Sequence, residues 1–249
     1  MSESTSSLYN RSQEIWVRQE PVLLSDYTAR PFLLKACEPL GGARVLDLGC
    51  GEGYVSRQIA KRGAASILAY DISEGMIEQA RQAERREPCG IEYHVGDVSQ
   101  ELHLPPQSFD LAIAVFLFNY LDLAQMQRVF ETVHQALKPG GRFIYTVPHP
   151  LLPFLRPQER PFYFDRGTAG YFSGRDLLFE GRIWRRDGID VPVRCLHKTF
   201  ADYFNAMRAA GFKHMPKVSE LHVTEAHIQL DPDFFEPLRD QPLHVLFEI

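Results

Sequence analysis

The chain is poor in the features that mark secreted, metal-binding or membrane-spanning proteins. It has only four cysteines in 249 residues, and they are widely spaced, without a C-x-x-C pair or a histidine at metal-ligand spacing. We therefore expect a reduced, cytoplasmic protein without a bound metal. The longest uninterrupted apolar run is the eight residues 111–118, and the N-terminal segment is polar. This pattern predicts neither a signal peptide nor a membrane span.

An excess of basic residues is also missing. Lysine and arginine number 27 against 32 aspartates and glutamates, which gives a formal net charge of -5. Because nucleic-acid phosphates select basic surfaces, a polynucleotide substrate is disfavoured, although a local basic patch could still exist. The length suits one domain with an attached lobe.

Residues 43–147 alternate short apolar runs with amphipathic stretches. That rhythm predicts βαβ units and a parallel sheet. The expected strands cover residues 43–48, 66–71, 91–97, 109–118 and 142–147. The expected helices cover residues 54–63, 74–87 and 123–137. Two terminal strands, near 215–224 and 243–249, complete an α/β core.

The flanking segments differ from this core. Before residue 40, two short helices broken by Pro21 and Pro31 are expected to cap the sheet. After residue 147 the chain is rich in proline, glycine, aromatics and arginine, which we interpret as an inserted lobe with little regular helix. Thr199 and Asp202 form a capping-box pattern that starts a further helix. The predicted single domain thus comprises a cap (1–42), a core (43–147), a lobe or lid (148–198) and the completion of the core (199–249).

The stretch VLDLGCGEGY, residues 45–54, places Gly49, Gly51 and Gly53 directly after a strand. A strand, a glycine-rich turn and a helix put backbone amides at the sheet edge where α/β folds bind nucleotides. The dinucleotide fingerprint would need glycine at position 54, which is tyrosine. Asp47 instead gives D-x-G-x-G-x-G, and its carboxylate suits a cationic amine better than a diphosphate.

This loop resembles the first motif of the class I S-adenosylmethionine-dependent methyltransferases, in which it passes under the methionine and ribose of the cofactor. Asp71 ends the second strand, where an acidic group meets ribose hydroxyls. Gly96, Asp97 and Val98 end the third strand, where the family usually places an aspartate on the adenine amine. The run LKPGGRF, residues 137–143, is similar to the family's turn into strand five. Alternatively, Asp71 caps a helix with Ser73, and Asp97 is a surface turn residue.

The resemblance implies further site residues and a fold. Ile72 and Met76 would flank the adenine, although Met76 can equally be a core residue. Cys50 and Val115 complete the predicted cofactor set. The implied fold is a Rossmann-like, doubly wound, seven-stranded and mostly parallel sheet with the last strand antiparallel. YNRSQEIW and HKTFADYFNAMRAAGF look like segments of the small-molecule, ubiquinone-biosynthesis-like branch of the family.

Methyl transfer from a sulfonium requires the protein mainly to position the acceptor and exclude water, and a hydroxyl acceptor also needs a base. His149, clamped between Pro148 and Pro150 after strand five, is our first choice for that base or for a substrate orienter. A structural histidine is the alternative. Asn119 and Tyr120 follow strand four and are predicted to orient substrate or assist catalysis, unless they cap a helix or pack in the core.

The lobe supplies the remaining substrate candidates. Its eight aromatics between residues 154 and 184, Tyr171 among them, could wall an apolar substrate or form a small core of their own. His197 could contact substrate or pack at a helix end. Residues 149–198 carry nine basic against six acidic side chains. An acidic acceptor group could therefore be read by one of four arginines, unless these form a solvated face: Arg182, Arg185, Arg186 and Arg194.

The sequence therefore predicts a methyltransferase that uses S-adenosyl-L-methionine and a small-molecule acceptor, with a hydroxyl oxygen of a specialised metabolite favoured by His149. Nitrogen or carbon acceptors stay open. So do methylation of RNA or protein, and a non-catalytic sensor that only binds the cofactor. The protein is expected to be a monomer or a homodimer.

Overall fold

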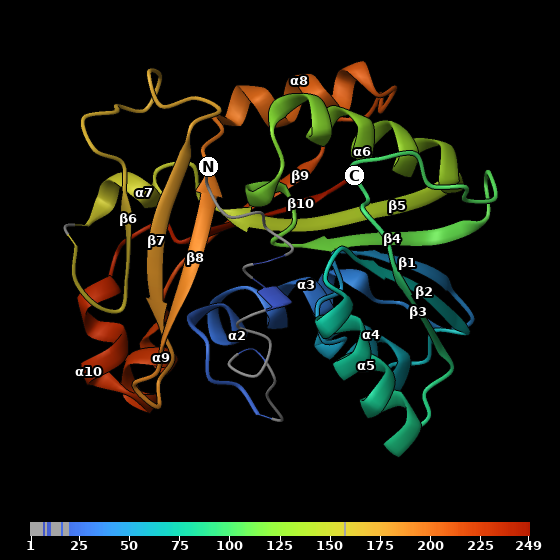
Figure 1. Ribbon diagram of the computed structural model, residues 1–249, viewed down its shortest axis with the longest axis horizontal. Helices are drawn as coiled ribbons and strands as arrows, with labels where there is room; N and C mark the ends of the chain where they lie inside the picture. Colours follow the sequence, from blue (N-terminus) through green and yellow to red (C-terminus); the bar gives the residue numbers. More distant parts are fainter. Residues whose placement is uncertain (1–6, 8, 11–15, 17–19, 157) are drawn as a thin grey trace.

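The computed structural model describes residues 7, 9, 10, 16, 20–156 and 158–249. Its main element is a seven-stranded sheet with the order β3-β2-β1-β4-β5-β10-β9 (Figure 1). The strands are β1 (Arg44–Leu48), β2 (Ser66–Asp71), β3 (Ile91–Val95), β4 (Phe109–Val115), β5 (Leu137–Pro148), β9 (Lys217–Leu221) and β10 (His244–Glu248). Only β10 runs antiparallel to its neighbours, β5 and β9. The predicted doubly wound α/β fold is confirmed.

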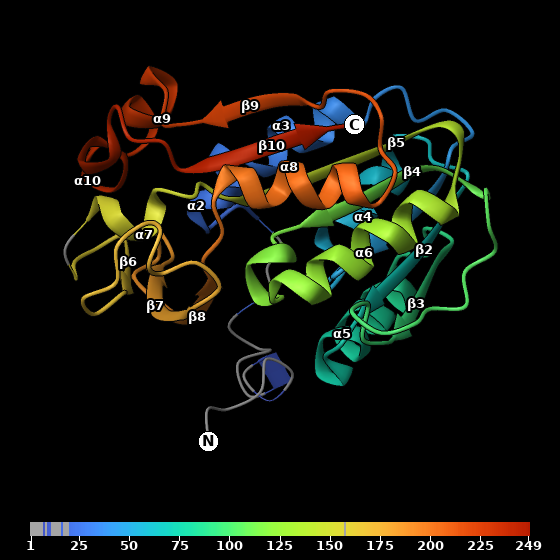
Figure 2. The ribbon, with the colours of Figure 1, turned by 90° about the horizontal axis from the view of Figure 1, so that it is seen from above.

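Helices cover both faces of this sheet (Figure 2). One face carries α3 (Arg30–Cys37), α4 (Tyr54–Lys61) and α5 (Glu74–Arg86), and the other carries α6 (Leu123–Ala136) and α8 (Phe200–Ala209). Because successive strand residues point to opposite faces, Val45 packs with the first group and Leu46 with the second. Among the described residues, no helix is long and apolar enough to cross a membrane.

Side chains that accept hydrogen bonds from backbone amides mark the starts of two helices. The Ser73 hydroxyl accepts from the Met76 amide and caps α5, and Asp202 accepts from the Thr199 amide at the start of α8, as the capping-box pattern predicts. The N-terminal cap contains α2 (Leu24–Thr28) followed by α3. Pro31 lies in the first turn of α3 instead of breaking a helix, because proline's missing N–H costs nothing there.

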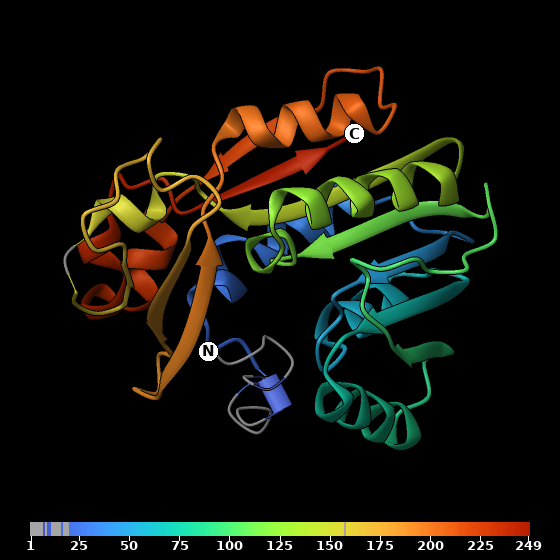
Figure 3. The same cartoon turned by 45° about the horizontal axis from the view of Figure 1, so that its top comes forward.

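The segment after β5 contains a second sheet. Its strands are β6 (Phe162–Asp165), β7 (Leu178–Trp184) and β8 (Asp190–Leu196), all antiparallel. They lie beside α7 (Leu152–Leu155), α9 (Glu225–Leu230), α10 (Pro232–Phe235) and η2 (Glu236–Leu238) (Figure 3). These elements share an apolar cluster that includes Phe162, Phe179 and Phe235. This lobe stands at the end of the main sheet toward which β4 and β5 point (Figure 1).

Candidate active site

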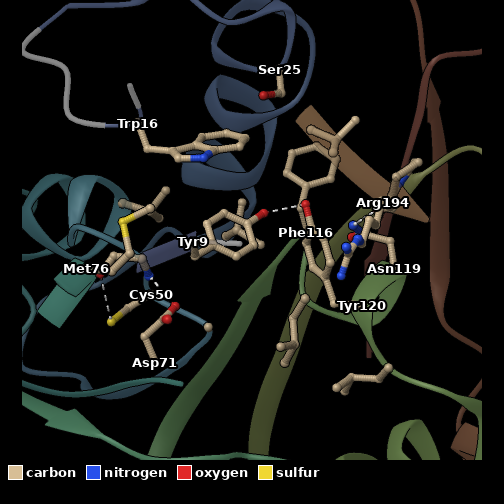
Figure 4. Close-up of a pocket in the computed structure, with 18 of the residues that line it drawn as sticks. Tyr9, Trp16, Ser25, Cys50, Asp71, Met76, Phe116, Asn119, Tyr120 and Arg194 are labelled. Carbon is tan, nitrogen blue, oxygen red and sulfur yellow. Dashed lines mark hydrogen bonds between the residues drawn. The ribbon is translucent and has the colours of Figure 1, made fainter. Parts of the chain in front are cut away.

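A cavity of about 360 Å³ lies between the carboxyl edge of the main sheet and the lobe (Figure 4). One end, the cofactor end, is lined by the glycine loop and by the residues that follow β2 and β3. The other, the acceptor end, is lined by the residues after β4, by the start of β10 and by β6, β7 and β8. Carboxyl ends of parallel strands meet at one sheet edge, so segments far apart in the chain converge here.

The glycine loop is held tightly against β2. The amides of Gly49 and Cys50 both donate to the Tyr70 carbonyl, at 2.8 and 2.9 Å. Gly49 has a φ of +76° and Gly53 a φ of +81°, both in the left-handed region that favours glycine. A Cβ on Gly53 would lie 2.4 Å from the Tyr93 hydroxyl oxygen. Glycine is therefore needed at position 53, where α4 begins. Gly53 was predicted to bind the cofactor, but it does not line the cavity.

Asp47 is a buried carboxylate that lines the cofactor end, with only 1% of its surface exposed. Its Oδ2 accepts from the Ser56 hydroxyl, and its Oδ1 has no hydrogen-bond partner among the residues that the structure describes. Burial raises the pKa of Asp47 to about 7, although the Ser56 hydrogen bond opposes the shift. An unpartnered buried oxygen is costly, and the cationic amine of S-adenosylmethionine would satisfy it.

Asp71 and Asp97 line the same end of the cavity. The Asp71 carboxylate accepts from the Gly51 amide at 2.8 Å and from the Ser73 amide at 2.9 Å, so it also fixes the loop. Burial raises the pKa of Asp71, and these two bonds oppose that shift. Each oxygen keeps a further lone pair for a ribose hydroxyl. Asp97 accepts through Oδ1 from the amide and hydroxyl of Ser99, which leaves Oδ2 for an adenine amine.

The other predicted cofactor residues also border the cavity. They are Cys50, Gly51, Ile72, Met76, Gly96, Val98 and Val115, together with Gly49. Met76 is almost fully buried, so it is a core residue and a cavity wall at once. A Cβ on Gly96 would lie 3.0 Å from the Tyr70 ring, so glycine keeps this strand end close to its neighbour. The residues present therefore fit the predicted cofactor.

Asn119 and Tyr120 lie at the acceptor end, in the short helix η1 (Phe118–Tyr120) that follows β4. The Tyr9 hydroxyl donates to the Tyr120 hydroxyl, as Figure 4 shows. Asn119 donates through Nδ2 to the Arg194 carbonyl at 3.4 Å. Burial raises the pKa of Tyr120, so it stays a neutral phenol that can donate a hydrogen bond to substrate.

The acceptor end is otherwise mostly apolar. Its walls include Leu121, Leu152, Phe162, Phe164, Ile183 and Val193. Polar side chains that the sequence did not single out also line the acceptor end, among them Tyr9, Ser25, Arg30 and His244, and Glu52 lines the cofactor end. A signal for His244 existed, because the terminal strand predicted at 243–249 begins here, and an antiparallel strand begins at the edge where its parallel neighbours end. Of the four arginines considered, only Arg194 reaches the cavity.

The structure does not bring His149 to the cavity, which corrects the expectation for its position. Its ring is 2% exposed and packs against Phe200. Nδ1 accepts from the Leu151 amide at 3.1 Å, so Nε2 carries the hydrogen and donates to Glu220 at 2.7 Å. Burial lowers the pKa of His149. With both nitrogens engaged away from the cavity, this geometry argues against a role as base.

His197, Tyr171 and Arg182 also lie outside the cavity lining. The His197 ring stacks on Phe179 with centroids 5.8 Å apart, and its Nε2 donates to the Tyr171 carbonyl at 2.8 Å. Arg182 is half exposed and pairs with Asp190. The lobe aromatics thus divide: some form a small core around His197, and others wall the cavity. In the described part of the chain, no cluster of His, Cys, Asp or Glu could hold a metal ion.

Comparison with known proteins agrees with this geometry. Residues 45–141 match a family model described as a methyltransferase domain. The crystal structure of an S-adenosylmethionine-dependent methyltransferase from Mesorhizobium loti is 32% identical, covers 88% of this chain and 95% of that one, and superimposes with a TM-score of 0.66.

Two curated relatives are named as O-methyltransferases. A malonyl-[acyl-carrier protein] O-methyltransferase of Enterobacter lignolyticus is 28% identical over 202 residues, which is 81% of this chain and 72% of that protein. A ubiquinone biosynthesis O-methyltransferase of Xylella fastidiosa is 30% identical over 118 residues, only 47% of each chain. The likeness to the Mesorhizobium loti enzyme extends well beyond the glycine loop. The chain accordingly belongs to the S-adenosylmethionine-dependent methyltransferases, with S-adenosylmethionine as its cofactor.

Proposed function

We propose that the protein transfers the methyl group to a hydroxyl oxygen of a small, mostly apolar molecule held between the sheet edge and the lobe. The observation that carries this proposal is the single cavity that joins Asp47 and Asp71 to the apolar walls of the lobe. A mostly apolar cavity with a few polar groups is typical of small-molecule sites.

Residues at the cofactor end and at the acceptor end of the cavity have different roles. Bound S-adenosylmethionine would supply a methyl group that is already activated by its sulfonium. Asp47, Asp71 and the glycine loop hold the cofactor, while the lobe walls exclude water from the acceptor. Tyr120, held by Tyr9, orients the acceptor through its neutral hydroxyl. The two relatives named as O-methyltransferases support oxygen as the acceptor atom.

A matched acceptor panel tests the proposal. The protein is incubated with methyl-labelled S-adenosylmethionine and with substituted phenols, the corresponding anilines and the corresponding toluenes. We expect label in phenols alone. Val193→Phe should block transfer without weakening cofactor binding, because Val193 lines the acceptor end. Ile189→Phe is the matched control, since Ile189 is 45% exposed in the same lobe.

Other outcomes would overturn the proposal in distinct ways. Label confined to anilines or to carbon would identify another acceptor atom. Labelled RNA or protein would exclude the small-molecule assignment. Cofactor binding without transfer to any acceptor in a metabolite library would instead indicate a sensor.

A further inference from the structure

His244 occupies the place at the sheet edge that the sequence predicts for His149. It is the first residue of β10 and lies opposite Pro148 in the antiparallel register. Residues directly opposite each other point to the same face of a sheet, and neighbours along a strand point to opposite faces. Pro148 and His244 accordingly both line the cavity, whereas His149 points to the face covered by Phe200.

Hydrogen bonding fixes the tautomer of His244. The Thr28 hydroxyl lies 2.9 Å from the Leu24 carbonyl, which can only accept, so its hydrogen points there. The Thr28 oxygen must therefore accept from Nδ1 of His244, 3.1 Å away. A neutral imidazole carries one N–H, which leaves a lone pair on Nε2. Among the described residues, the hydrogen-bond partner of the His244 ring is Thr28, which contacts Nδ1 and not Nε2.

The surroundings keep the ring neutral. Phe116 packs edge-on against it with centroids 5.1 Å apart, and the Arg30 guanidinium lies over the same phenylalanine. Burial, then the positive charge of Arg30 and the nearby His149, lower the pKa of His244 to about 3. Thr28, Arg30, Phe116 and His149 are the groups that face or influence it from α2, α3 and the ends of β4 and β5.

We propose that His244 is a catalytic residue whose Nε2 takes the hydroxyl proton of the acceptor during methyl transfer; this inference rests on the proposed function. The acceptor oxygen forms its bond to the methyl carbon as the carbon–sulfur bond breaks and the electron pair stays on sulfur. The proton moves to Nε2, which gives a methyl ether, a neutral thioether and an imidazolium that later loses its proton to water. Thr28 is a positioning residue that aims Nε2 at the acceptor.

A weak base is adequate at this position. The acceptor oxygen becomes strongly acidic as it gains the methyl group, so even a weakly basic nitrogen can take its proton. The positive charge of Arg30 disfavours a lasting imidazolium, which returns His244 to its neutral form after each turnover.

The activity test uses a substitution that preserves the Thr28 contact. His244→Asn keeps a donor near the position of Nδ1 but removes Nε2. We expect kcat for the phenol acceptor to fall ~10²-fold or more, with cofactor affinity changed less than about threefold. His214→Asn is the matched control, because His214 is exposed and lies away from the cavity. Unchanged kcat in His244→Asn would overturn the proposal.

A spectroscopic test does not depend on turnover. Nitrogen-15 NMR of the imidazoles should show His244 as the Nδ1–H tautomer, unprotonated at Nε2. Adding S-adenosylhomocysteine and a phenol should shift the Nε2 resonance, whereas the matched toluene should not. Thr28→Val should relax the tautomer and lower kcat, and Thr28→Ser should restore both. An Nε2–H tautomer, or equal shifts with phenol and toluene, would overturn the proposal.

The two proposals fail differently. If wild-type protein labels no phenol, the proposed function is wrong, and the resonance of Nε2 with phenol still decides whether this nitrogen receives a hydroxyl. If wild type and His244→Asn label phenols equally, only the role of His244 is wrong.

Discussion

The two ends of the cavity are built in different ways. The cofactor end comes from residues 47–99 and carries four carboxylates, Asp47, Glu52, Asp71 and Asp97. The acceptor end draws on residues from Tyr9 to His244, and its charged side chains are Arg30 and Arg194. One end therefore depends on short motifs at successive strand ends, and the other depends on how distant segments pack. A motif can identify the methyl donor, but the acceptor is defined only by the assembled fold.

The largest effect is expected from a mutation in the lobe, which should lower the stability of the protein but leave its cofactor affinity unchanged. Phe179 is buried in the lobe cluster, so Phe179→Ala should lower the free energy of unfolding by about 3–5 kcal/mol and reduce methyl transfer. Cofactor affinity of the folded protein, measured by calorimetry, should stay within about twofold. Phe172→Ala is the control, since Phe172 is 81% exposed. Equal loss of cofactor affinity would show that the two ends are coupled.

The second prediction concerns the cofactor end. Asp71→Ala removes the acceptor of the Gly51 and Ser73 amides as well as the predicted ribose contact. Affinity for S-adenosylmethionine should fall ~10²-fold, or about 2.7 kcal/mol. Asp165→Ala is a matched control, because Asp165 accepts from a nearby loop amide but is exposed. Normal cofactor affinity in Asp71→Ala would contradict the assignment.

A third prediction uses the pH dependence of Asp47. Its pKa is raised from 3.8 to about 7, so the cofactor-free protein holds a proton that the unfolded chain has lost between those values. Through this group, the free energy of unfolding falls as pH rises across that window. Cofactor binding needs the ionised form, so affinity should rise about 25-fold from about pH 5.5 to about pH 7.5. Calorimetry of Asp47→Asn should show weaker binding without that rise; an unaltered pH profile would exclude Asp47 as its source.

The smallest effect is expected at Arg182. Its ion pair with Asp190 is half exposed, so Arg182→Ala should change the free energy of unfolding by no more than about 0.5 kcal/mol. KM for the acceptor should be unchanged, because Arg182 does not line the cavity. Arg194→Gln, which alters a cavity-lining side chain, should raise that KM. A larger effect from Arg182 would show that the acceptor site extends onto this outer surface.

Particular residues show how far prediction from the sequence reached. The boundaries of β2 match the predicted 66–71, and most predicted cofactor residues border the cavity. Those successes depend on local signals: apolar runs, the glycine loop and acidic residues at strand ends. The lobe was predicted to contain little regular helix, and its three-stranded sheet was not predicted. The Asp187–Gly188 turn between β7 and β8 was a local hairpin signal, whereas the pairing of β6 with β7 depends on the tertiary structure. His149 was the wrong histidine to place at the cavity, because one residue along a strand reverses the face.

The sequence by itself determined the α/β rhythm, the cofactor-binding loop and hence the methyl donor, since each depends on residues close together in the chain. Only the tertiary structure decided that His244 faces the cavity while His149 does not, and that Tyr9, Arg30 and Arg194 join the acceptor end. The physical reason is that strand register and packing between distant segments set side-chain direction, and neither is encoded in local spacing.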